Sequence, residues 1–275
     1  MTRFLQTLRA APYTARFGMA VILLVAVIAI LAPVIAPYGE TADVGEQYEP
    51  WSSRFLLGTD NLGRDMFSRL VFGTRNTVGL ALLTTAIAFT VGSLLGIVAA
   101  VTGGMTDRLL SRIIDVIMAI PSLILALMLL TIVGASIASM VLVIALIYVA
   151  PVFRLARASA QSVVVMDYIQ AARLRGEGLA WLVLKEVLPN IASTLVAEFG
   201  LRFCFVFLFI AALSFLGLGI QPPTADWGSM LKENATLISF GDITPLLPAA
   251  AIAMLTVSIN FVVDWMLHRS SGLKD

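Results

Sequence analysis

YIQAARLRGEGLAWLVLKEVLPN, residues 168–190, is a polar interruption between two long apolar stretches of the chain. Its charged side chains would be costly in hydrocarbon, so this segment is predicted to lie outside the bilayer. Apolar residues recur at helical spacing on both sides of Gly176-Glu177-Gly178, and Leu188-Pro189 follows the second run. Because glycine adopts positive φ without strain, the pattern predicts two short amphipathic helices joined at a glycine, the second ending at the proline. A projection of this kind suits the transmission of force to a soluble partner.

The composition indicates a membrane protein. Hydrophobic residues make up 59% of the 275 residues and charged residues only 13%, whereas about a quarter of the residues in a soluble domain are charged. The single cysteine, Cys204, and the single histidine, His268, exclude a disulfide framework and a Cys/His metal cluster. The chain has no GxxxxGK[ST] phosphate loop and no Ser/His/Asp set. We therefore expect an all-α, polytopic membrane protein that is not an enzyme, holds no metal or cofactor of its own and binds no nucleic acid.

Six apolar stretches approach or exceed the roughly 20 residues that a helix needs to cross the bilayer core. Pro121 is expected to kink the third of them, and Gly92-Ser-Leu-Leu-Gly96 in the second predicts a close approach of another helix. Most of the 18 Lys and Arg residues fall in segments that are cytoplasmic if the N-terminus is inside. This bias places both termini and residues 168–190 in the cytoplasm. The six predicted spans are 18–36, 77–101, 113–133, 137–153, 191–218 and 245–267.

The spacing within residues 168–190 resembles the EAA loop of ABC importer permeases, which reads Glu-Ala-Ala, Gly and Leu-Pro at fixed distances. Gln170 stands where the family has Glu, so an ion pair from that position is not expected, and the aliphatic residue Val187 lies one position late. The resemblance implies that residues 173–185 hold a coupling helix that docks into an ATP-hydrolysing subunit; the alternative is an ordinary cytoplasmic helical hairpin. The implied ATPase-coupling residues are Gln170, Ala171, Ala172, Arg173, Arg175, Gly176, Leu179, Leu182, Leu188 and Pro189.

Three further strings resemble the peptide/nickel subfamily of these permeases. They are LLGTDNLGRDMFSR at 56–69, GGMTDRLLSRIIDVIMAIPSL at 103–123 and LSFLGLG, PP and WGSML within 213–231. The resemblance implies a type I ABC importer permease fold with six transmembrane helices. It divides the chain into residues 1–76, which hold an N-terminal cytoplasmic segment, the first transmembrane helix and an extracytoplasmic segment, and residues 77–275, a permease core of five transmembrane helices with a cytoplasmic EAA loop at 155–190.

The first of these strings, at 56–69, and the third, within 213–231, are candidates for contact with an extracytoplasmic binding protein. The residues proposed for that contact are Asp60, Arg64, Asp65 and Trp227. The alternative for the first string is a short interfacial helix that begins near Met66 and merely orients the second span. The alternative for Trp227 is a purely structural role at the outer surface.

Glu198 and Arg202 lie inside the fifth predicted span, four residues apart and therefore on one helix face. Charged pairs within a membrane usually face a bundle interior or a water-filled cavity. Two interpretations follow. The pair lines the translocation pathway and meets the charged ends of a zwitterionic substrate, or it is a structural ion pair within the helix or across to a second subunit.

The resemblance implies the permease subunit of an ATP-driven importer that forms half of the pathway for di- or oligopeptides or a similar small polar solute. It implies a homologous second permease, two ATPase subunits that bind the ATP and Mg, and an extracytoplasmic solute-binding protein, in the cytoplasmic membrane of a bacterium or archaeon. Nickel, opines or glutathione are alternative solutes. An ion-gradient-driven secondary transporter that couples through Glu198 and Arg202 is the alternative from another class, and an ATP-independent scaffold is a third.

Overall fold

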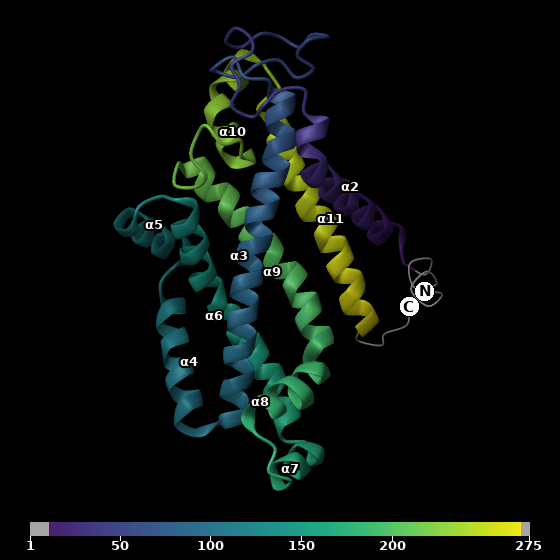
Figure 1. The fold of residues 1–275 in the computed structure, drawn as a ribbon, viewed down its shortest axis with the longest axis vertical. Coiled ribbons are helices and arrows are strands. Elements are labelled where there is room, and N and C mark those ends of the chain that lie inside the picture. Colours follow the sequence, from purple (N-terminus) through teal and green to yellow (C-terminus); the bar gives the residue numbers. More distant parts are fainter. Residues whose placement is uncertain (1–10, 271–275) are drawn as a thin grey trace. The chain divides into compact units, whose positions relative to one another are not determined.

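The structure is a computed structural model that describes residues 11–270 (Figure 1). Across these residues the secondary structure is helical, apart from two isolated β-bridges, Asp43–Arg64 and Thr59–Asp65. The predicted all-α class is therefore confirmed. The two chain ends, which the sequence predicts to be cytoplasmic, lie outside the described residues.

Among the described residues, five helices are long and apolar enough to cross a membrane, or up to six if a bent pair counts as one span. The bent pair consists of α4 (Gly104–Ala119) and α5 (Ser122–Val133), which meet at 90°. Pro121 lies at the break, where its ring also disfavours helical geometry at Ile120. The predicted kink is thus a complete interruption of the third span. The five continuous helices are α2 (Tyr13–Ile35), α3 (Met66–Thr102), α6 (Ile137–Val164), the helix Leu179–Leu216 and α11 (Leu246–Ser270).

α3 is one helix of 37 residues, so the separate short interfacial helix predicted to begin near Met66 is wrong. Asp65 determines where α3 begins, because its carboxylate accepts a hydrogen bond of 2.8 Å from the Ser68 backbone N–H. No proline interrupts the sequence between Met66 and Thr102. The helix therefore continues from the polar string at 56–69 through the second predicted span.

The chain divides into two compact units, each described here by itself. Unit 1 contains the described residues up to Leu82, then Ala135–Ala138 and Phe203–Trp265. It includes α2, α11 as far as Trp265, and the short helices α10 (Trp227–Asn234) and η2 (Ala235–Phe240). α2 and α11 pack closely, since a Cβ on Gly18 would lie 2.3 Å from the Ser258 carbonyl oxygen. The boundary predicted at residue 76 falls within α3, and the two-part division of the sequence stays a prediction.

Unit 2 contains Leu83–Gly134, Ser139–Arg202 and the described residues from Met266 onward. In this unit α3 and α6 approach at the predicted glycines: a Cβ on Gly92 would lie 2.8 Å from the Val149 oxygen, and one on Gly96 2.6 Å from the Phe153 oxygen. One apolar cluster joins the end of α3 to α6, α7 (Asp167–Leu174) and the start of the helix Leu179–Leu216. The cluster consists of Ile97, Val101, Ala156, Ala160, Val163, Ile169, Ala172, Leu182, Val183, Val187, Ile191 and Leu195.

Candidate functional sites

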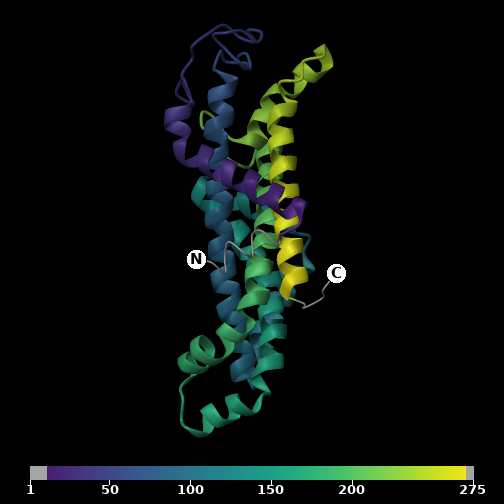
Figure 2. The ribbon, with the colours of Figure 1, turned by 90° about the vertical axis from the view of Figure 1, so that its right-hand side faces the viewer.

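The segment 167–190, which we call the elbow, lies at one end of unit 2 (Figure 2). α7 ends in a Schellman motif: the Gly176 N–H donates to the Arg173 oxygen at 3.0 Å, and the Glu177 N–H to the Ala172 oxygen at 3.2 Å. Gly176 has a φ of 83°, the left-handed conformation that this motif requires and that other residues adopt only with strain. The predicted glycine joint is therefore present.

The second half of the elbow differs from the prediction, because its helix does not end at Leu188-Pro189. α8 (Leu179–Trp181), the π-helical segment η1 (Leu182–Val187) and α9 (Leu188–Leu216) form one continuous helix. Pro189 has no N–H to donate, but the neighbouring Asn190 side chain donates to the Glu186 oxygen at 2.5 Å. A π turn (i→i+5) immediately before the proline accommodates it within the helix. The predicted coupling helix at 173–185 is accordingly split between the end of α7, the turn and the start of this long helix.

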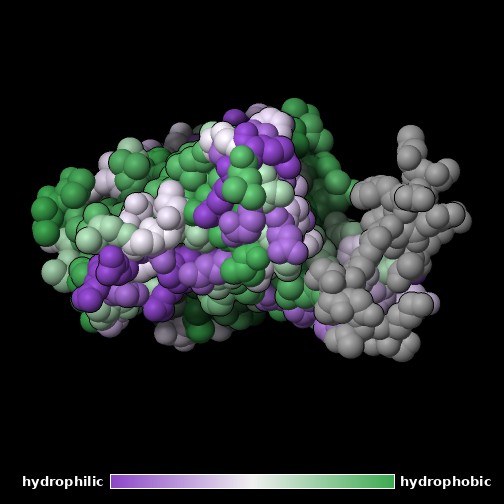
Figure 3. Space-filling model, turned by 90° about the horizontal axis from the view of Figure 1, so that it is seen from below, coloured by the Kyte–Doolittle hydropathy of each residue, from purple (hydrophilic) through white to green (hydrophobic). Residues whose placement is uncertain are grey.

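The elbow has an inward and an outward face. Ala172 and Leu182 point into the apolar cluster, and Leu182 is only 6% exposed. Leu174, by contrast, is 90% exposed. Figure 3 views the molecule from the end at which α7 lies and shows hydrophobic side chains among hydrophilic ones. The remaining predicted coupling residues are exposed or half-buried: Gln170, Ala171, Arg173, Arg175, Gly176, Leu179, Leu188 and Pro189.

Three outward-facing side chains of the elbow were not among the residues predicted from the sequence. Tyr168, Leu174 and Trp181 are all exposed although they are large and apolar or aromatic. They lie outside the helically spaced apolar positions that form the inward face. Large apolar or aromatic residues at such positions could have indicated an exposed surface from the sequence alone. Trp181 also donates from its Nε1 to Glu186 at 3.1 Å, which fixes the indole on the surface.

Glu198 and Arg202 form an ion pair within α9. The Arg202 Nε donates to the Glu198 Oε1 at 3.0 Å, and a guanidinium Nη2 contacts the same oxygen. Their side chains are 11% and 14% exposed. Glu198 and Arg202 thus lie on one face of α9, as predicted, and their opposite charges compensate each other within that helix.

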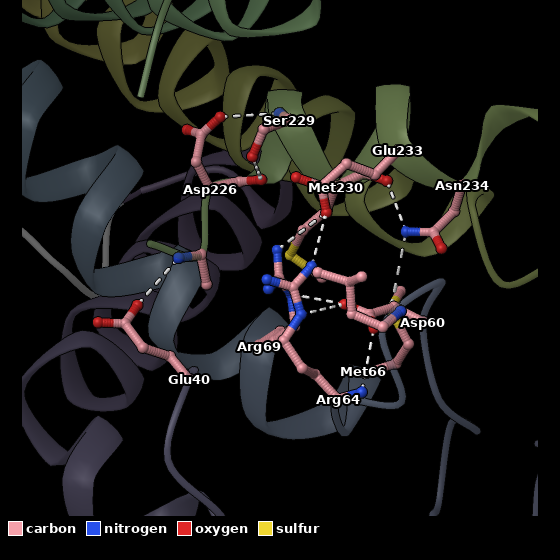
Figure 4. Close-up of polar contacts among 12 residues, drawn as sticks. Glu40, Asp60, Arg64, Met66, Arg69, Asp226, Ser229, Met230, Glu233 and Asn234 are labelled. Carbon is pink, nitrogen blue, oxygen red and sulfur yellow. Dashed lines mark hydrogen bonds and ion pairs between the residues drawn. The ribbon is translucent and has the colours of Figure 1, made fainter. Parts of the chain in front are cut away.

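The four side chains proposed to contact a binding protein are buried in unit 1. Asp60, Arg64, Asp65 and Trp227 are each at most 3% exposed. Asp60 and Arg64 contact other residues of the same unit (Figure 4), Asp65 accepts from Ser68, and Trp227 donates to Leu70. Direct side-chain contact with a soluble protein is not supported by this arrangement. Asp60 and Arg64 are buried by the pairing of charges described next, and Trp227 by its packing against α3. The burial of Trp227 agrees with the structural alternative for that residue.

Two arginines and two carboxylates form a buried polar cluster in unit 1. Arg64 contacts Asp60 at 2.7 Å and Glu233 at 3.1 Å. Arg69 contacts the same carboxylates at 3.3 and 3.1 Å. Because Glu233 belongs to α10, the four charges join α10 to the polar string before and within α3 (Figure 4). The sequence analysis missed Arg69 and Glu233; Arg69 lies in the same string, but nothing local indicates its partner on α10.

Asp226 and Trp227 fix the start of α10 against α3. Asp226 accepts hydrogen bonds from the Ser229 N–H at 2.9 Å and from the Thr77 hydroxyl at 2.8 Å. Burial raises the pKa of the Asp226 carboxyl, and these hydrogen bonds oppose that change only in part. The Trp227 Nε1 donates to the Leu70 oxygen at 3.0 Å, and its ring lies against Gly73, where a Cβ would be 2.8 Å from the indole.

No group of three or more His, Cys, Asp or Glu side chains among the described residues is arranged to hold a metal ion. The features that the described residues do provide are an elbow with two faces and a polar cluster within unit 1.

Residues 92–271 match the family model for the binding-protein-dependent transport system inner membrane component, and residues 13–50 match the N-terminal transmembrane domain of oligopeptide transport permease C. The chain belongs to this family of inner membrane components, and it is therefore a multi-pass permease subunit of an ABC importer. The type I permease assignment made from the sequence is confirmed, and the secondary-transporter and scaffold alternatives are not favoured.

Individual relatives agree with this assignment. The chain is 36% identical to the di/tripeptide transport system permease protein DppC of Pseudomonas aeruginosa, over 94% of this chain and 85% of the relative. It is 32% identical to the dipeptide transport system permease protein DppC of Haemophilus influenzae, over 95% and 88%. It is 33% identical to the glutathione transport system permease protein GsiD of Pectobacterium atrosepticum, over 94% and 84%.

Proposed function

We propose that this chain forms half of the translocation pathway of an importer for di- or oligopeptides. The observation that carries the proposal is similarity along almost the whole chain to permeases named for dipeptides, di/tripeptides and glutathione. Glutathione is itself a small peptide, so these solutes share charged ends and amide groups. Nickel and opines are alternative solutes, but no relative cited above is named for either.

The importer is proposed to contain a homologous second permease, so that the two chains form a heterodimer, together with two ATPase subunits and an extracytoplasmic solute-binding protein. ATP and Mg would be held by the ATPase subunits. The distribution of Lys and Arg supports an orientation with both termini and the elbow in the cytoplasm, where ATP is present.

In this proposal the outward face of the elbow docks onto an ATPase subunit. Exposed apolar side chains such as Leu174 and Trp181 suit burial in a cleft of a partner protein. The inward face is continuous with the apolar cluster of unit 2, so a displaced elbow would press on the helices that it packs against. ATP binding and hydrolysis by the partners would supply the free-energy difference between outward-facing and inward-facing states.

The Glu198–Arg202 pair is proposed to face the pathway. Neither side chain is completely buried in this chain, and a partly exposed ion pair is disfavoured against lipid. A hydrated pathway satisfies both charges and allows them to meet the termini of a peptide. The alternative is a structural pair covered by the second permease. Replacing Glu198 and Arg202 by Gln together should change peptide uptake or preference in an assembled complex if the pair faces the pathway.

The proposed function is tested by uptake of a radiolabelled dipeptide into proteoliposomes that contain this chain, its partner permease and the binding protein. Uptake should require both the ATPase subunits and ATP. Uptake driven by a proton or sodium gradient without the ATPase subunits would contradict the proposal. ATP-dependent uptake of nickel but of no peptide would keep the importer class and overturn the proposed solute.

A further inference from the structure

Arg173 of the elbow contacts the backbone at the end of α3, beside the turn between α3 and α4. This contact was not predicted from the sequence. α3 ends at Thr102, and Gly103 and Gly104 follow with φ values of 62° and 58°. The last carbonyls of a helix lack partners within it. Thr102 Oγ1 donates to the Val98 oxygen at 2.8 Å and the Gly103 N–H to the Ala99 oxygen at 2.9 Å. The Val101 oxygen instead accepts a hydrogen bond from Arg173 of α7, whose Nη2 lies 2.7 Å away.

Arg173 therefore serves a different role from Arg175, although the two are separated by one residue. The guanidinium of Arg173 lies at the carboxyl end of α3, where the helix dipole favours a positive charge. The Arg175 side chain is 59% exposed, and its nearest carboxylates, Glu177 and Glu186, are 3.8 and 3.9 Å away. Both arginines are exposed, so what separates them is the contact that each makes: Arg173 donates to the backbone at the end of α3, whereas Arg175 has only distant carboxylate neighbours.

The same turn is held from a second side by α6. Asp107, in the first turn of α4, accepts two hydrogen bonds from Arg157 of α6, at 2.5 and 2.6 Å. A bidentate pair of this kind fixes both distance and orientation. The segment 101–107 is thus bound to α7 through Arg173 at Val101 and to α6 through Arg157 at Asp107. Apolar packing joins the same elements, but it is non-directional and does not fix their register.

We infer that Arg173 is a positioning residue that transmits displacement of the elbow to the α3–α4 turn, and that it is not an ATPase contact. The inference rests on the proposed function, because it supposes that an ATPase subunit displaces the elbow. Movement of α7 would pull on the Val101 carbonyl through a directional, charge-assisted hydrogen bond. Without that bond, α7 would slide over the apolar cluster, and ATP hydrolysis would continue with less movement of α3.

The test uses the complete importer in proteoliposomes, with three readouts: ATPase subunits retained on purification, ATP hydrolysis, and dipeptide transported per ATP hydrolysed. For Arg173→Ala we expect normal retention, hydrolysis within about twofold of wild type, and transport per ATP reduced about tenfold, as loss of a hydrogen bond to a charged donor suggests. Arg173→Lys keeps a donor and should recover most of the loss. Arg175→Ala should lower retention instead. Arg112→Ala, an exposed arginine on α4, is the matched control and should change none of the three.

Loss of ATPase subunits from Arg173→Ala, or wild-type transport per ATP in that variant, would overturn the inference and leave the proposed function intact. Absence of ATP-dependent uptake in the wild-type importer would instead overturn the proposed function.

A second measurement does not require an Arg173 variant to fold. Spin labels at Met105 and Asp167, in a Cys204→Ser chain that retains Arg173, should keep one separation with and without ATP; a change in that separation contradicts the inference.

Discussion

The elbow of unit 2 and the polar cluster of unit 1 use charged residues in opposite ways. In the elbow, apolar side chains fill the inward face, and Arg175 lies on the surface. In the polar cluster, Arg64 and Arg69 are buried against two carboxylates, and the charges hold parts of one unit together. The comparison teaches that a charged string at a membrane surface does not by itself mark a docking site. What distinguishes the two regions is burial: Arg64 and Arg69 are enclosed with their carboxylates, whereas Arg175 remains 59% exposed beside its own.

The largest expected effect concerns the polar cluster. Arg69→Ala removes one of two positive charges and leaves Asp60 and Glu233 under-compensated in a buried site, which costs about 3–5 kcal/mol of stability. The expected result is a markedly lower thermal unfolding temperature of the purified chain in detergent. Arg75→Ala, an exposed arginine on the same helix, should change stability by no more than about 0.5 kcal/mol. If Arg69→Ala and Arg75→Ala lowered the unfolding temperature equally, burial of Arg69 would not account for its contribution to stability.

The second prediction compares the two faces of the elbow. Leu182→Ala removes a buried side chain from the apolar cluster and should cost about 2–5 kcal/mol of stability. Leu174→Ala, at a position that is 90% exposed, should leave stability within about 0.5 kcal/mol of wild type while weakening retention of the ATPase subunits. Thermal unfolding of the isolated chain and pull-down of the ATPase subunits measure the two effects separately. A stability loss from Leu174→Ala as large as that from Leu182→Ala would remove the distinction between the faces.

A smaller effect on stability is expected at the contact between α3 and α6, where Gly96 packs against Phe153. Gly96→Ala places a methyl group 2.6 Å from the Phe153 oxygen and 2.9 Å from the Arg157 nitrogen, and overpacking of this kind costs about 1–3 kcal/mol. Gly79→Ala is the control, because nothing lies within 4 Å of its added Cβ; it should be neutral or stabilising by up to about 1 kcal/mol. Thermal unfolding of both variants tests the prediction, which fails if the two substitutions behave alike.

The smallest effect is a pH dependence from Asp226. Burial raises the pKa of this carboxyl in the folded chain above its ordinary value of 3.8, so the ionised form is disfavoured there. The contribution of Asp226 to stability is therefore fully present below pH 3.8, falls as pH rises through the raised pKa, and is constant above it. Asp226→Asn cannot ionise and should lack this fall. As pH rises from 3.8 through the raised pKa, the unfolding temperature of wild type should fall relative to that of Asp226→Asn. Parallel curves of unfolding temperature against pH would contradict the raised pKa of Asp226.

Much of the fold could be predicted from the sequence, because membrane spans and the glycine joint depend on local patterns. Gly176 supplies the positive φ of a helix end, and Gly92 and Gly96 predict a close approach to another helix. The end predicted at Pro189 was wrong, since the π-helical segment before it and Asn190 after it accommodate the missing N–H. Local signals identify a proline but not the register of the turn that precedes it.

The candidate sites were less predictable, because burial depends on residues distant in the sequence. Asp60 and Arg64 look like solvent-exposed charges until Glu233, 169 residues from Arg64, is placed beside them. The inward and outward faces of the elbow, by contrast, follow helical spacing, and the position of Ala172 on the inward face agrees with it. Arg173 lies between these cases: its sequence position suggested a partner protein, and only the fold reveals the carboxyl end of α3 as its neighbour.

The continuous helix beginning at Leu179 has a mechanical consequence. Within unit 2 it runs without a loop from the elbow to Arg202, a length of about 36 Å at 1.5 Å per residue. Trp181 of the elbow and the Glu198–Arg202 ion pair are thus two points on one uninterrupted helix. In the proposed importer, a rotation imposed on the elbow would reorient the Glu198 and Arg202 side chains directly, so that docking of the ATPase subunit and the lining of the proposed pathway would change in the same movement.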